Sequence, residues 1–307
     1  MTTNVQKIFS FIDTYAESKE MLYLEAAIEA CERWLDDPSK LLLTDPISKE
    51  EIRRGIQLAI LKGMKQSAQP HHQMTPDSIG MLIGHIASKL ADGQQSVTVL
   101  DPAAGTGNLL YTVMNAMDGR ISATAVEIDD LLVKLSAITS ELLEQPVTFF
   151  IQDALRPLLV DPVDMTVSDL PVGFYPDDEN AMDYELMPKE GHAYAHHLFI
   201  EQSMKHTKEG GFGIFIMPAN LFDSDQSSVL HPYLKNKTAI RAVIQLPDSL
   251  FKNASLAKSI LILQKPFSGM KQSDVLLAKV PDMTNKHAMA LFLQKIDMWT
   301  EEESLKK

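Results

Sequence analysis

The chain has 307 residues, of which 45% are hydrophobic, so it can bury a sizeable core in one large domain or in a domain with a smaller companion. Its formal net charge of -13 argues against nucleic-acid binding through a broadly basic surface, although a local basic stripe remains compatible with that total. The single cysteine, Cys31, excludes an internal disulfide and a cysteine-based zinc site.

Residues 1–20 contain no basic segment followed by an apolar run, so they predict no secretory signal peptide. Apolar runs such as residues 212–217 are too short to cross a bilayer. These features predict a cytoplasmic protein without a membrane segment.

The N-terminal part of the chain is predicted to be helical. Apolar residues recur at helical spacing around residues 26–35 and 52–60, and Ser48 and Glu51 have the spacing of a capping box. Residues 64–76 are polar and contain two prolines, which places a domain boundary near residue 67. We therefore expect a helical domain of residues 1–66 and a larger domain of residues 67–307, which begins with a helix over 77–90.

The larger domain alternates short β-branched or aromatic runs with helical patterns, which is typical of a mostly parallel sheet covered by helices. Helices are expected over 108–117, 130–143, 192–207 and 227–235. One more strand and an amphipathic helix are expected within 275–307. The other predicted strands are 96–100, 121–127, 147–152, 165–168, 213–217, 240–246 and 259–264.

The most informative segment runs from the first of these strands through Asp101, Gly105 and Gly107 into a helix. Glycines let a ligand approach the backbone closely, and ligands of open α/β sheets bind at the carboxyl ends of strands. Glu127 ends the next strand and is suited to accept hydrogen bonds from the ribose hydroxyls of an adenosine cofactor. Asp153 ends the third strand, where its carboxylate or the nearby backbone could accept from the adenine amino group.

The loop favours S-adenosylmethionine over a nicotinamide dinucleotide. The third glycine of the dinucleotide pattern is replaced by Leu110. Asp101 would repel a pyrophosphate, but it suits the cationic methionine end of S-adenosylmethionine. A nicotinamide-binding protein is the more remote alternative.

Residues 101–110, Asp-Pro-Ala-Ala-Gly-Thr-Gly-Asn-Leu-Leu, resemble the first motif of adenine-N6 DNA methyltransferases. Residues 73–79 resemble the segment of those enzymes that closes over the methionine part of the cofactor. Residues 210–222 and 242–251 resemble modification subunits of type I restriction systems. The resemblance covers roughly residues 67–267 and implies a Rossmann-like, mostly parallel α/β sheet of seven strands, one of them antiparallel.

The resemblance also implies which residues bind the cofactor, S-adenosylmethionine, and it implies no metal. These residues are Thr75, Pro76, Asp101, Pro102, Ala103, Gly105, Thr106, Gly107, Asn108, Glu127, Ile128, Asp153, Ala154 and Asp169.

In this family a polar residue, two prolines and an aromatic residue follow the fourth strand, and the matching segment here begins at Asp169. The resemblance implies that an Asp169 oxygen accepts one N–H of an exocyclic adenine amine, and that the main-chain carbonyl beside Pro171 accepts the other. The nitrogen can then pyramidalise and attack the methyl group in line. The aromatic residue stacks on a base that is flipped out of the duplex.

Two residues depart from this motif. Leu170 replaces the first proline, and Val172 stands where the aromatic residue is expected. Phe174 or Tyr175 is the candidate for the missing stacking ring, with simple packing of the loop as the alternative for both.

The surroundings of the motif bear on the substrate. Residues 157–188 contain eight acidic residues and no lysine or arginine, a composition that repels a phosphate backbone. The resemblance implies DNA as the leading substrate, whereas this acidic composition argues against duplex DNA as the substrate unless a separate recognition subunit helps to bind it. The alternatives are a methyltransferase acting on RNA, protein or a small molecule, and a regulatory module that binds the cofactor without transferring its methyl group.

Histidines raise the question of a metal site. His192 and His196 have the spacing that places two ligands on one helix face. No third ligand stands near them in the sequence, so surface or helix-cap histidines are expected instead.

Overall fold

The computed structural model describes residues 3–44, 46–66, 74–253, 256–271 and 273–304. Three helices form an N-terminal layer: α1 (Asn4–Glu17), α2 (Tyr23–Asp36) and α3 (Lys49–Gln66), with the 3₁₀ turn η1 (Pro38–Lys40) before α3. The predicted capping box is confirmed, because the Glu51 N–H donates to Ser48 Oγ at 3.2 Å and the Ser48 N–H donates to the Glu51 carboxylate at 3.0 Å.

The rest of the described chain is one mixed sheet with helices on both faces. The strands are β1 (Val97–Asp101), β2 (Ile121–Glu127), β3 (Val147–Ile151), β4 (Val163–Asp169), β5 (Thr207–Pro218), β6 (Ala239–Gln245), β7 (Lys258–Gln264) and β8 (Leu276–Lys279). The helices are α4 (Asp77–Leu90), α5 (Asn108–Ala116), α6 (Asp130–Leu142), α7 (Asp178–Ala181), α8 (Ala195–Lys205), α9 (Ser227–Lys237) and α10 (Lys286–Ser304). Two further 3₁₀ turns are η2 (Leu221–Asp223) and η3 (Asp248–Leu250).

The strand order is β3-β2-β1-β4-β5-β7-β6-β8, and β7 runs antiparallel to both of its neighbours. The predicted α/β class with one antiparallel strand is confirmed. The sheet has eight strands where the family resemblance implies seven. The additional strand is β8, which pairs in parallel with β6 and lies in the region where a further strand and helix are predicted.

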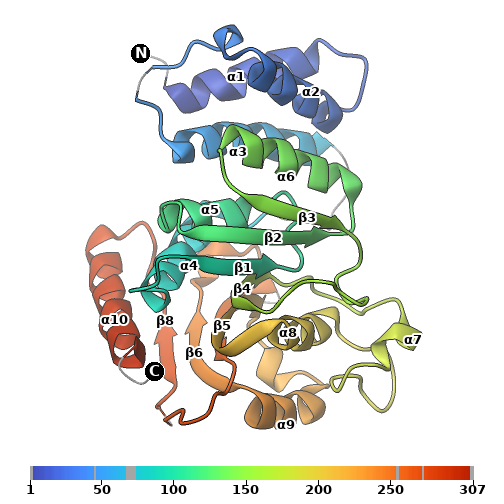
Figure 1. Ribbon diagram of the computed structural model, residues 1–307, viewed down its shortest axis with the longest axis vertical. Coiled ribbons are helices and arrows are strands. Elements are labelled where there is room, and N and C mark those ends of the chain that lie inside the picture. The colour runs from blue at the N-terminus through green and yellow to red at the C-terminus, as the bar shows by residue number, and fades with distance from the viewer. Residues whose placement is uncertain (1–2, 45, 67–73, 254–255, 272, 305–307) are drawn as a thin grey trace.

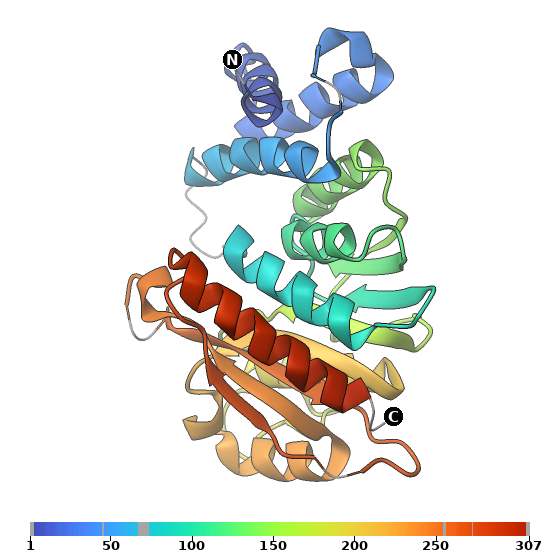
Figure 2. The same ribbon diagram turned by 90° about the vertical axis from the view of Figure 1, so that its left-hand side faces the viewer.

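The N-terminal helices rest on the end of the sheet that carries β3 (Figure 1). α6 lies between the two parts, since it packs against α2 and α3 on one side and against β2 and β3 on the other. On the opposite side of the molecule, α10 lies alongside α4 (Figure 2), and His85 of α4 contacts the Asp297 carboxylate of α10 at 2.8 Å.

α3 ends at Gln66, and the predicted boundary near residue 67 falls within residues 67–73, which lie outside the described residues. We propose the division into residues 1–66 and 67–307. None of the helices in the described part of the chain combines the length and the apolar character that a bilayer crossing requires.

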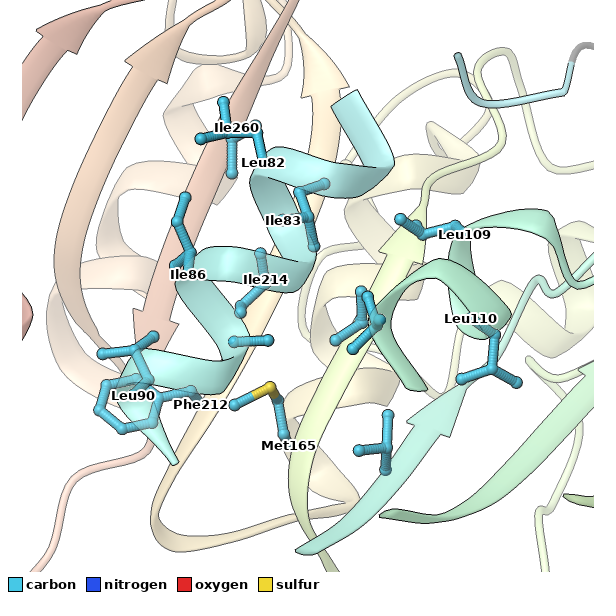
Figure 3. Close-up of a cluster of buried hydrophobic side chains, with 14 of the residues drawn as sticks. Leu82, Ile83, Ile86, Leu90, Leu109, Leu110, Met165, Phe212, Ile214 and Ile260 are labelled. Carbon is cyan, nitrogen blue, oxygen red and sulfur yellow. The ribbon is translucent and has the colours of Figure 1, made fainter. Parts of the chain in front are cut away.

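The main core lies between the sheet and the layer of α4, α5 and α10. Apolar residues of α4 recur at intervals of three and four, so one stripe of the helix faces the strands. Figure 3 shows this stripe within one cluster of side chains: Leu82, Ile83, Ile86 and Leu90 of α4 lie among Leu109, Leu110, Met165, Phe212, Ile214 and Ile260.

Replacing Ile86 by alanine is expected to lower the free energy of unfolding by roughly 2–5 kcal/mol, because it leaves a cavity in this cluster. Ile86 is fully buried, whereas Met81 on the same helix is 59% exposed. The matched control, Met81→Ala, should change stability by about 0.5 kcal/mol or less. Urea denaturation of both variants checks this, and equal losses would contradict the placement of the core.

Candidate functional site

The carboxyl edge of the sheet collects three acidic residues. Asp101, Glu127 and Asp169 are the last residues of β1, β2 and β4, and these strands are parallel neighbours. The parallel register, which pairs Asp101 with Ala125, therefore brings the three carboxylates to one end of adjacent strands. This is the edge where open α/β sheets bind their ligands.

The glycine loop links β1 to α5 at this edge. Gly105 and Gly107 have φ angles of 54° and 76°, which favour glycine. A Cβ on Gly107 would clash with the Tyr111 ring and lie 2.5 Å from Ser136 Oγ, so only glycine lets α5 begin here. A Cβ on Gly105 would meet no atom within 4 Å, so that side of the loop is open to a ligand.

The Glu127 side chain faces the glycine loop and also holds its backbone in place through hydrogen bonds. One carboxylate oxygen accepts the Gly105 N–H at 2.9 Å, and the other accepts the N–H groups of Ile128 and Asp129 at 2.9 and 3.0 Å. The side chain is half-buried, and carboxylate lone pairs remain for further donors such as ribose hydroxyls. Ile128 is exposed beside it and offers an apolar surface at the same edge.

Asp101 lies beneath the loop. Its Oδ1 accepts the Ser168 hydroxyl at 2.8 Å and the Ala103 N–H at 3.1 Å, which joins the loop to β4. The pKa of Asp101 is raised to about 7, mainly by burial and also by the nearby carboxylates of Glu127 and Asp169, against the lowering effect of the two hydrogen bonds. Because the side chain is buried, it would act on a bound cation through its charge and through the loop it holds.

Asp169 has two partners that come from distant parts of the chain. Thr75 Oγ1 donates to Oδ2 at 2.8 Å, and Lys258 Nζ donates to Oδ1 at 2.6 Å. Lys258 is a site residue that the sequence reasoning missed. It begins β7, and because β7 is antiparallel, the start of this strand pairs with Pro218 at the carboxyl edge. The signal that could have found Lys258 is a lysine at the start of the antiparallel strand that the family resemblance implies.

The departure at Leu170 has a structural reason. The Leu170 N–H donates to the Ile216 carbonyl at 3.0 Å and so continues the pairing of β4 with β5. Proline has no N–H for this bond. The Leu170 side chain is buried in the core beneath α8 and α9, while Val172 and Pro171 are exposed beyond it.

Tyr175 does not offer a stacking surface, which corrects the role predicted for it. Its side chain is buried, and its hydroxyl donates to Asp153 Oδ2 at 2.6 Å. Asp153 also accepts the Leu155 N–H at 2.9 Å. Burial raises the pKa of Tyr175, as does the hydrogen bond to Asp153. Tyr175 therefore fixes Asp153 at the end of β3 and packs the loop, which is the alternative considered above.

Phe174, in contrast, is 58% exposed and is supported from behind by other rings. Its ring stacks on Tyr194 with centroids 4.9 Å apart and planes within 8°, and Tyr194 stacks in turn on His196 at 5.0 Å. Burial lowers the pKa of His196 to about 3, so this imidazole is neutral. His192 lies exposed against Asp178 and precedes α8, whereas His196 is buried within α8, which corrects the surface or cap position expected for His196.

The acidic segment 157–188 carries less unpaired charge than its composition implies. Lysine and arginine side chains from other elements reach four of its eight acidic residues, which offsets the repulsion expected for a phosphate backbone. These pairs are Asp164 with Lys208, Asp169 with Lys258, Asp177 with Arg156 and Glu185 with Lys237.

The remaining predicted cofactor residues differ in exposure. Pro76 is exposed and Ala103 half-buried, both at the carboxyl edge. Buried positions, which act through the backbone or through packing, are Thr75, Pro102, Thr106, Asn108 and Ala154. A cavity of about 470 Å³ lies at the opposite edge, against Val97, Met165 and Phe212, and topology separates it from these residues.

Comparison with known proteins identifies the family. Residues 64–303 match the model of the N-6 DNA methylase family, and residues 10–64 match the model of the YtxK N-terminal helical domain. The chain belongs to the N-6 DNA methylase family. It is an S-adenosylmethionine-dependent methyltransferase of the N6-adenine type, with the class I methyltransferase fold.

Two relatives cover nearly the whole methyltransferase. The uncharacterised protein YtxK of Bacillus subtilis is 43% identical over 96% of this chain and 92% of its own length. A class I S-adenosylmethionine-dependent methyltransferase structure from Listeria monocytogenes is 40% identical, with a TM-score of 0.88, over 97% of this chain and 99% of that chain. A type I modification subunit from Vibrio vulnificus shares the fold at 18% identity, with a TM-score of 0.66, over 87% of this chain and 61% of its own.

The residues present fit the cofactor of this family. The open side of Gly105 provides the close approach to backbone, and the Glu127 carboxylate stands next to it. The three carboxylates at the edge suit a cationic ligand, since the attraction of a positive charge to them offsets their mutual repulsion. We propose that S-adenosylmethionine binds here through the predicted residues.

The raised pKa of Asp101 predicts a pH-dependent stability. The unfolded chain ionises Asp101 near its ordinary pKa of about 3.9, whereas the folded protein ionises it only near 7. The protonated Asp101 carboxyl group thus contributes its full stabilisation of the folded state below about pH 4, and this stabilisation is lost as the pH rises through about 7. The Asp101→Asn variant does not undergo this loss. The unfolding free energy of the variant minus that of wild type should therefore increase by roughly 1–4 kcal/mol between pH 4 and pH 8.

Thermal unfolding of the cofactor-free proteins across this pH range measures the effect. Asp130→Asn, at an exposed position on α6, is the matched control and should show no such growth. A constant difference between wild type and Asp101→Asn would refute the assignment.

Proposed function

We propose that this methyltransferase transfers a methyl group to the exocyclic amine of adenine in DNA. The observation that carries the proposal is the position of Asp169. It ends β4 at the carboxyl edge, next to the exposed Pro171, and its carboxylate bonds Thr75 in the segment that precedes α4. A hydrogen-bond acceptor for an amine thus stands beside the segment expected to close over the cofactor.

Methyl transfer requires that the lone pair of the exocyclic amine be localised on nitrogen instead of delocalised into the adenine ring. When bound, S-adenosylmethionine supplies an electrophilic methyl group. An Asp169 oxygen would accept one N–H, and the main-chain carbonyl beside Pro171 would accept the other, which holds the nitrogen pyramidal and aligned for attack. The amine loses one proton as it gains the methyl group, and Asp169 is placed to pass that proton to water.

Lys258 adds a feature to this arrangement. Its ammonium bonds the same carboxylate, and both side chains are about four-fifths buried. The pair keeps Asp169 from being an isolated buried charge, which would be costly. Each carboxylate oxygen has a second lone pair, so an amine can bind Asp169 while Lys258 and Thr75 hold it in place.

The exposed Phe174 ring is the proposed stacking surface for the target base. The stack of Tyr194 and His196 behind it fixes its plane, so the ring is presented with little loss of side-chain entropy. A ring two positions beyond Val172 would thereby replace the aromatic residue of the motif.

We further propose that a separate recognition subunit reads the DNA sequence. The two matched domains occupy residues 10–303, and the fold is shared with a modification subunit of a type I restriction enzyme. A second candidate function is methyl transfer to RNA, protein or a small molecule, which Leu170 and Val172 favour because they depart from the expected DNA motif.

Transfer of label from methyl-labelled S-adenosylmethionine tests the acceptor, with duplex DNA, single-stranded DNA, RNA and a protein extract offered in parallel. We expect label in DNA adenine, and its loss by at least about 100-fold in Asp169→Ala, since one correctly placed hydrogen-bond partner is worth about 2.7–4 kcal/mol in such sites. Label confined to RNA or protein would move the proposal to the second candidate. Labelling that persists in Asp169→Ala would remove this residue from the mechanism.

The stacking role of Phe174 has its own test. Phe174→Ala should lower kcat/KM for the nucleic acid by about 5- to 150-fold, the equivalent of 1–3 kcal/mol of stacking, with Phe174→Tyr close to wild type. Met182→Ala, at a similarly exposed apolar residue of the same region, is the control and should have little effect. An unchanged kcat/KM in Phe174→Ala would leave the ring with a packing role alone.

A further inference from the structure

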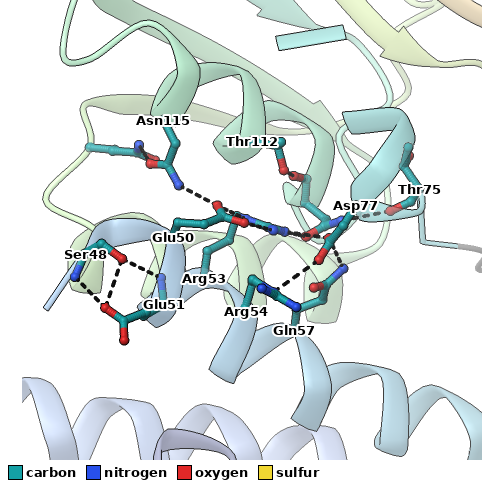
Figure 4. Close-up of polar contacts among 12 residues, drawn as sticks. Ser48, Glu50, Glu51, Arg53, Arg54, Gln57, Thr75, Asp77, Thr112 and Asn115 are labelled. Carbon is teal, nitrogen blue, oxygen red and sulfur yellow. Dashed lines mark hydrogen bonds and ion pairs between the residues drawn. The ribbon is translucent and has the colours of Figure 1, made fainter. Parts of the chain in front are cut away.

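Arg53 of α3 is a charged residue buried at the junction of the two domains. Its side chain is 1% exposed, and it is among the largest fully buried side chains of the described residues. Nε and Nη2 donate to the two carboxylate oxygens of Glu50 at 2.8 and 2.6 Å, a bidentate contact within α3. The third nitrogen, Nη1, is directed away from α3 toward the larger domain (Figure 4).

The contacts of Nη1 reach the first residues of two helices. It donates to Asp77 Oδ1 at 3.0 Å, at the start of α4, and to Asn108 Oδ1, at the start of α5. Gln57, one turn further along α3, donates to the same Asp77 oxygen at 2.6 Å. One guanidinium therefore fixes the distance between the beginnings of α4 and α5.

Both helix starts border the proposed cofactor site. α5 follows the glycine loop directly, and α4 follows Thr75 and Pro76. The other side of the Asn108 amide donates to the Thr75 carbonyl at 2.9 Å, and Thr75 Oγ1 bonds Asp169. A continuous set of hydrogen bonds thus runs from Arg53 through Asn108 and Thr75 to Asp169.

Within the larger domain the two helix starts also contact each other, because Asn108 bonds both the Asp77 carboxylate and the Thr75 carbonyl, and Arg53 adds a charged donor that Asp77 and Asn108 share. Asp77 has three partners on α3: Arg53, Gln57 and, at 3.7 Å, Arg54. Asn115 of α5 also donates to Glu50 at 3.2 Å. Removing the guanidinium would take away the donor that the Asp77 and Asn108 side chains share, leave Gln57 as a neutral donor to Asp77 Oδ1, and loosen the spacing of the two helix starts.

We propose that Arg53 is a positioning residue for the cofactor site, and that the helical domain thereby forms part of that site. It sets the spacing between the segment 75–77 and the loop 105–108, the two stretches between which the cofactor is held. This inference rests on the cofactor site proposed above. It requires no assumption about the methyl acceptor.

Calorimetric titration with S-adenosylhomocysteine, the demethylated form of the cofactor, provides the test because it needs no acceptor. Arg53→Met should raise Kd by roughly 10- to 100-fold, the equivalent of 1.5–3 kcal/mol for hydrogen bonds to a charged group. Arg53→Lys keeps the positive charge but loses the planar guanidinium group, so its Kd should lie between those of wild type and Arg53→Met. Lys65→Met is the matched control, since Lys65 is an exposed basic residue near the other end of α3, and its Kd should stay within about twofold.

A residue with a merely structural role gives a different result. It would lower the melting temperature of Arg53→Met with and without ligand by equal amounts, and Kd in the folded fraction would not change. That outcome overturns the proposal. A smaller ligand-induced rise in melting temperature, together with the weaker Kd, supports it.

If Arg53→Met does not fold, the variant Asp77→Asn provides a second test of the proposal. It preserves the shape of the side chain and weakens the attachment of α4 to Arg53, so Kd should rise several-fold, and an unchanged Kd would overturn the proposal. Failure of wild type itself to bind S-adenosylhomocysteine would instead refute the cofactor site. The two failures are therefore distinguishable.

Discussion

Three carboxylates share one edge of the sheet, and the need to hold these like charges in place governs the surrounding structure. Each is held by hydrogen-bond donors from another segment. Glu127 accepts the Gly105 N–H, Asp101 accepts the Ala103 N–H, and Asp169 accepts the Thr75 hydroxyl and the Lys258 ammonium. These hydrogen bonds fix the glycine loop, the segment before α4 and the start of β7, and the proposed cationic cofactor would offset part of the negative charge at this edge.

Much of the fold followed from local patterns in the chain. Short β-branched runs between helical patterns predicted the parallel strands, and the glycines with the acidic strand ends predicted the edge that carries the site. Lys258 could not be predicted in this way, since it lies at the start of an antiparallel strand rather than at the end of a parallel one. Arg53 was missed because its partners Asp77 and Asn108 lie far along the chain in another domain. Such contacts depend on how the domains pack, which spacing alone does not encode.

The altered catalytic segment shows how the same edge can accept different residues. Leu170 gains a backbone hydrogen bond that proline lacks and buries its side chain in the core, so the segment is anchored by the sheet itself. Of the two rings that follow, Tyr175 points inward to Asp153 and Phe174 outward, because neighbouring residues of this extended loop face opposite sides. Composition alone also overstated the acidity of this region, since its basic partners come from α9, β5, β7 and the loop before β4.

The contact between α3 and the starts of α4 and α5 limits how the two domains can be exchanged during evolution. A helical domain transplanted from a relative would bring its own residue at position 53, while Asp77 and Asn108 would remain behind in the recipient. A mismatched combination would leave either Arg53 without its contacts in the larger domain or Asp77 and Asn108 without the guanidinium that joins them. The three positions should therefore be inherited as a set, and gene fusions that join the domains at residues 67–73 would succeed only between lineages that share it.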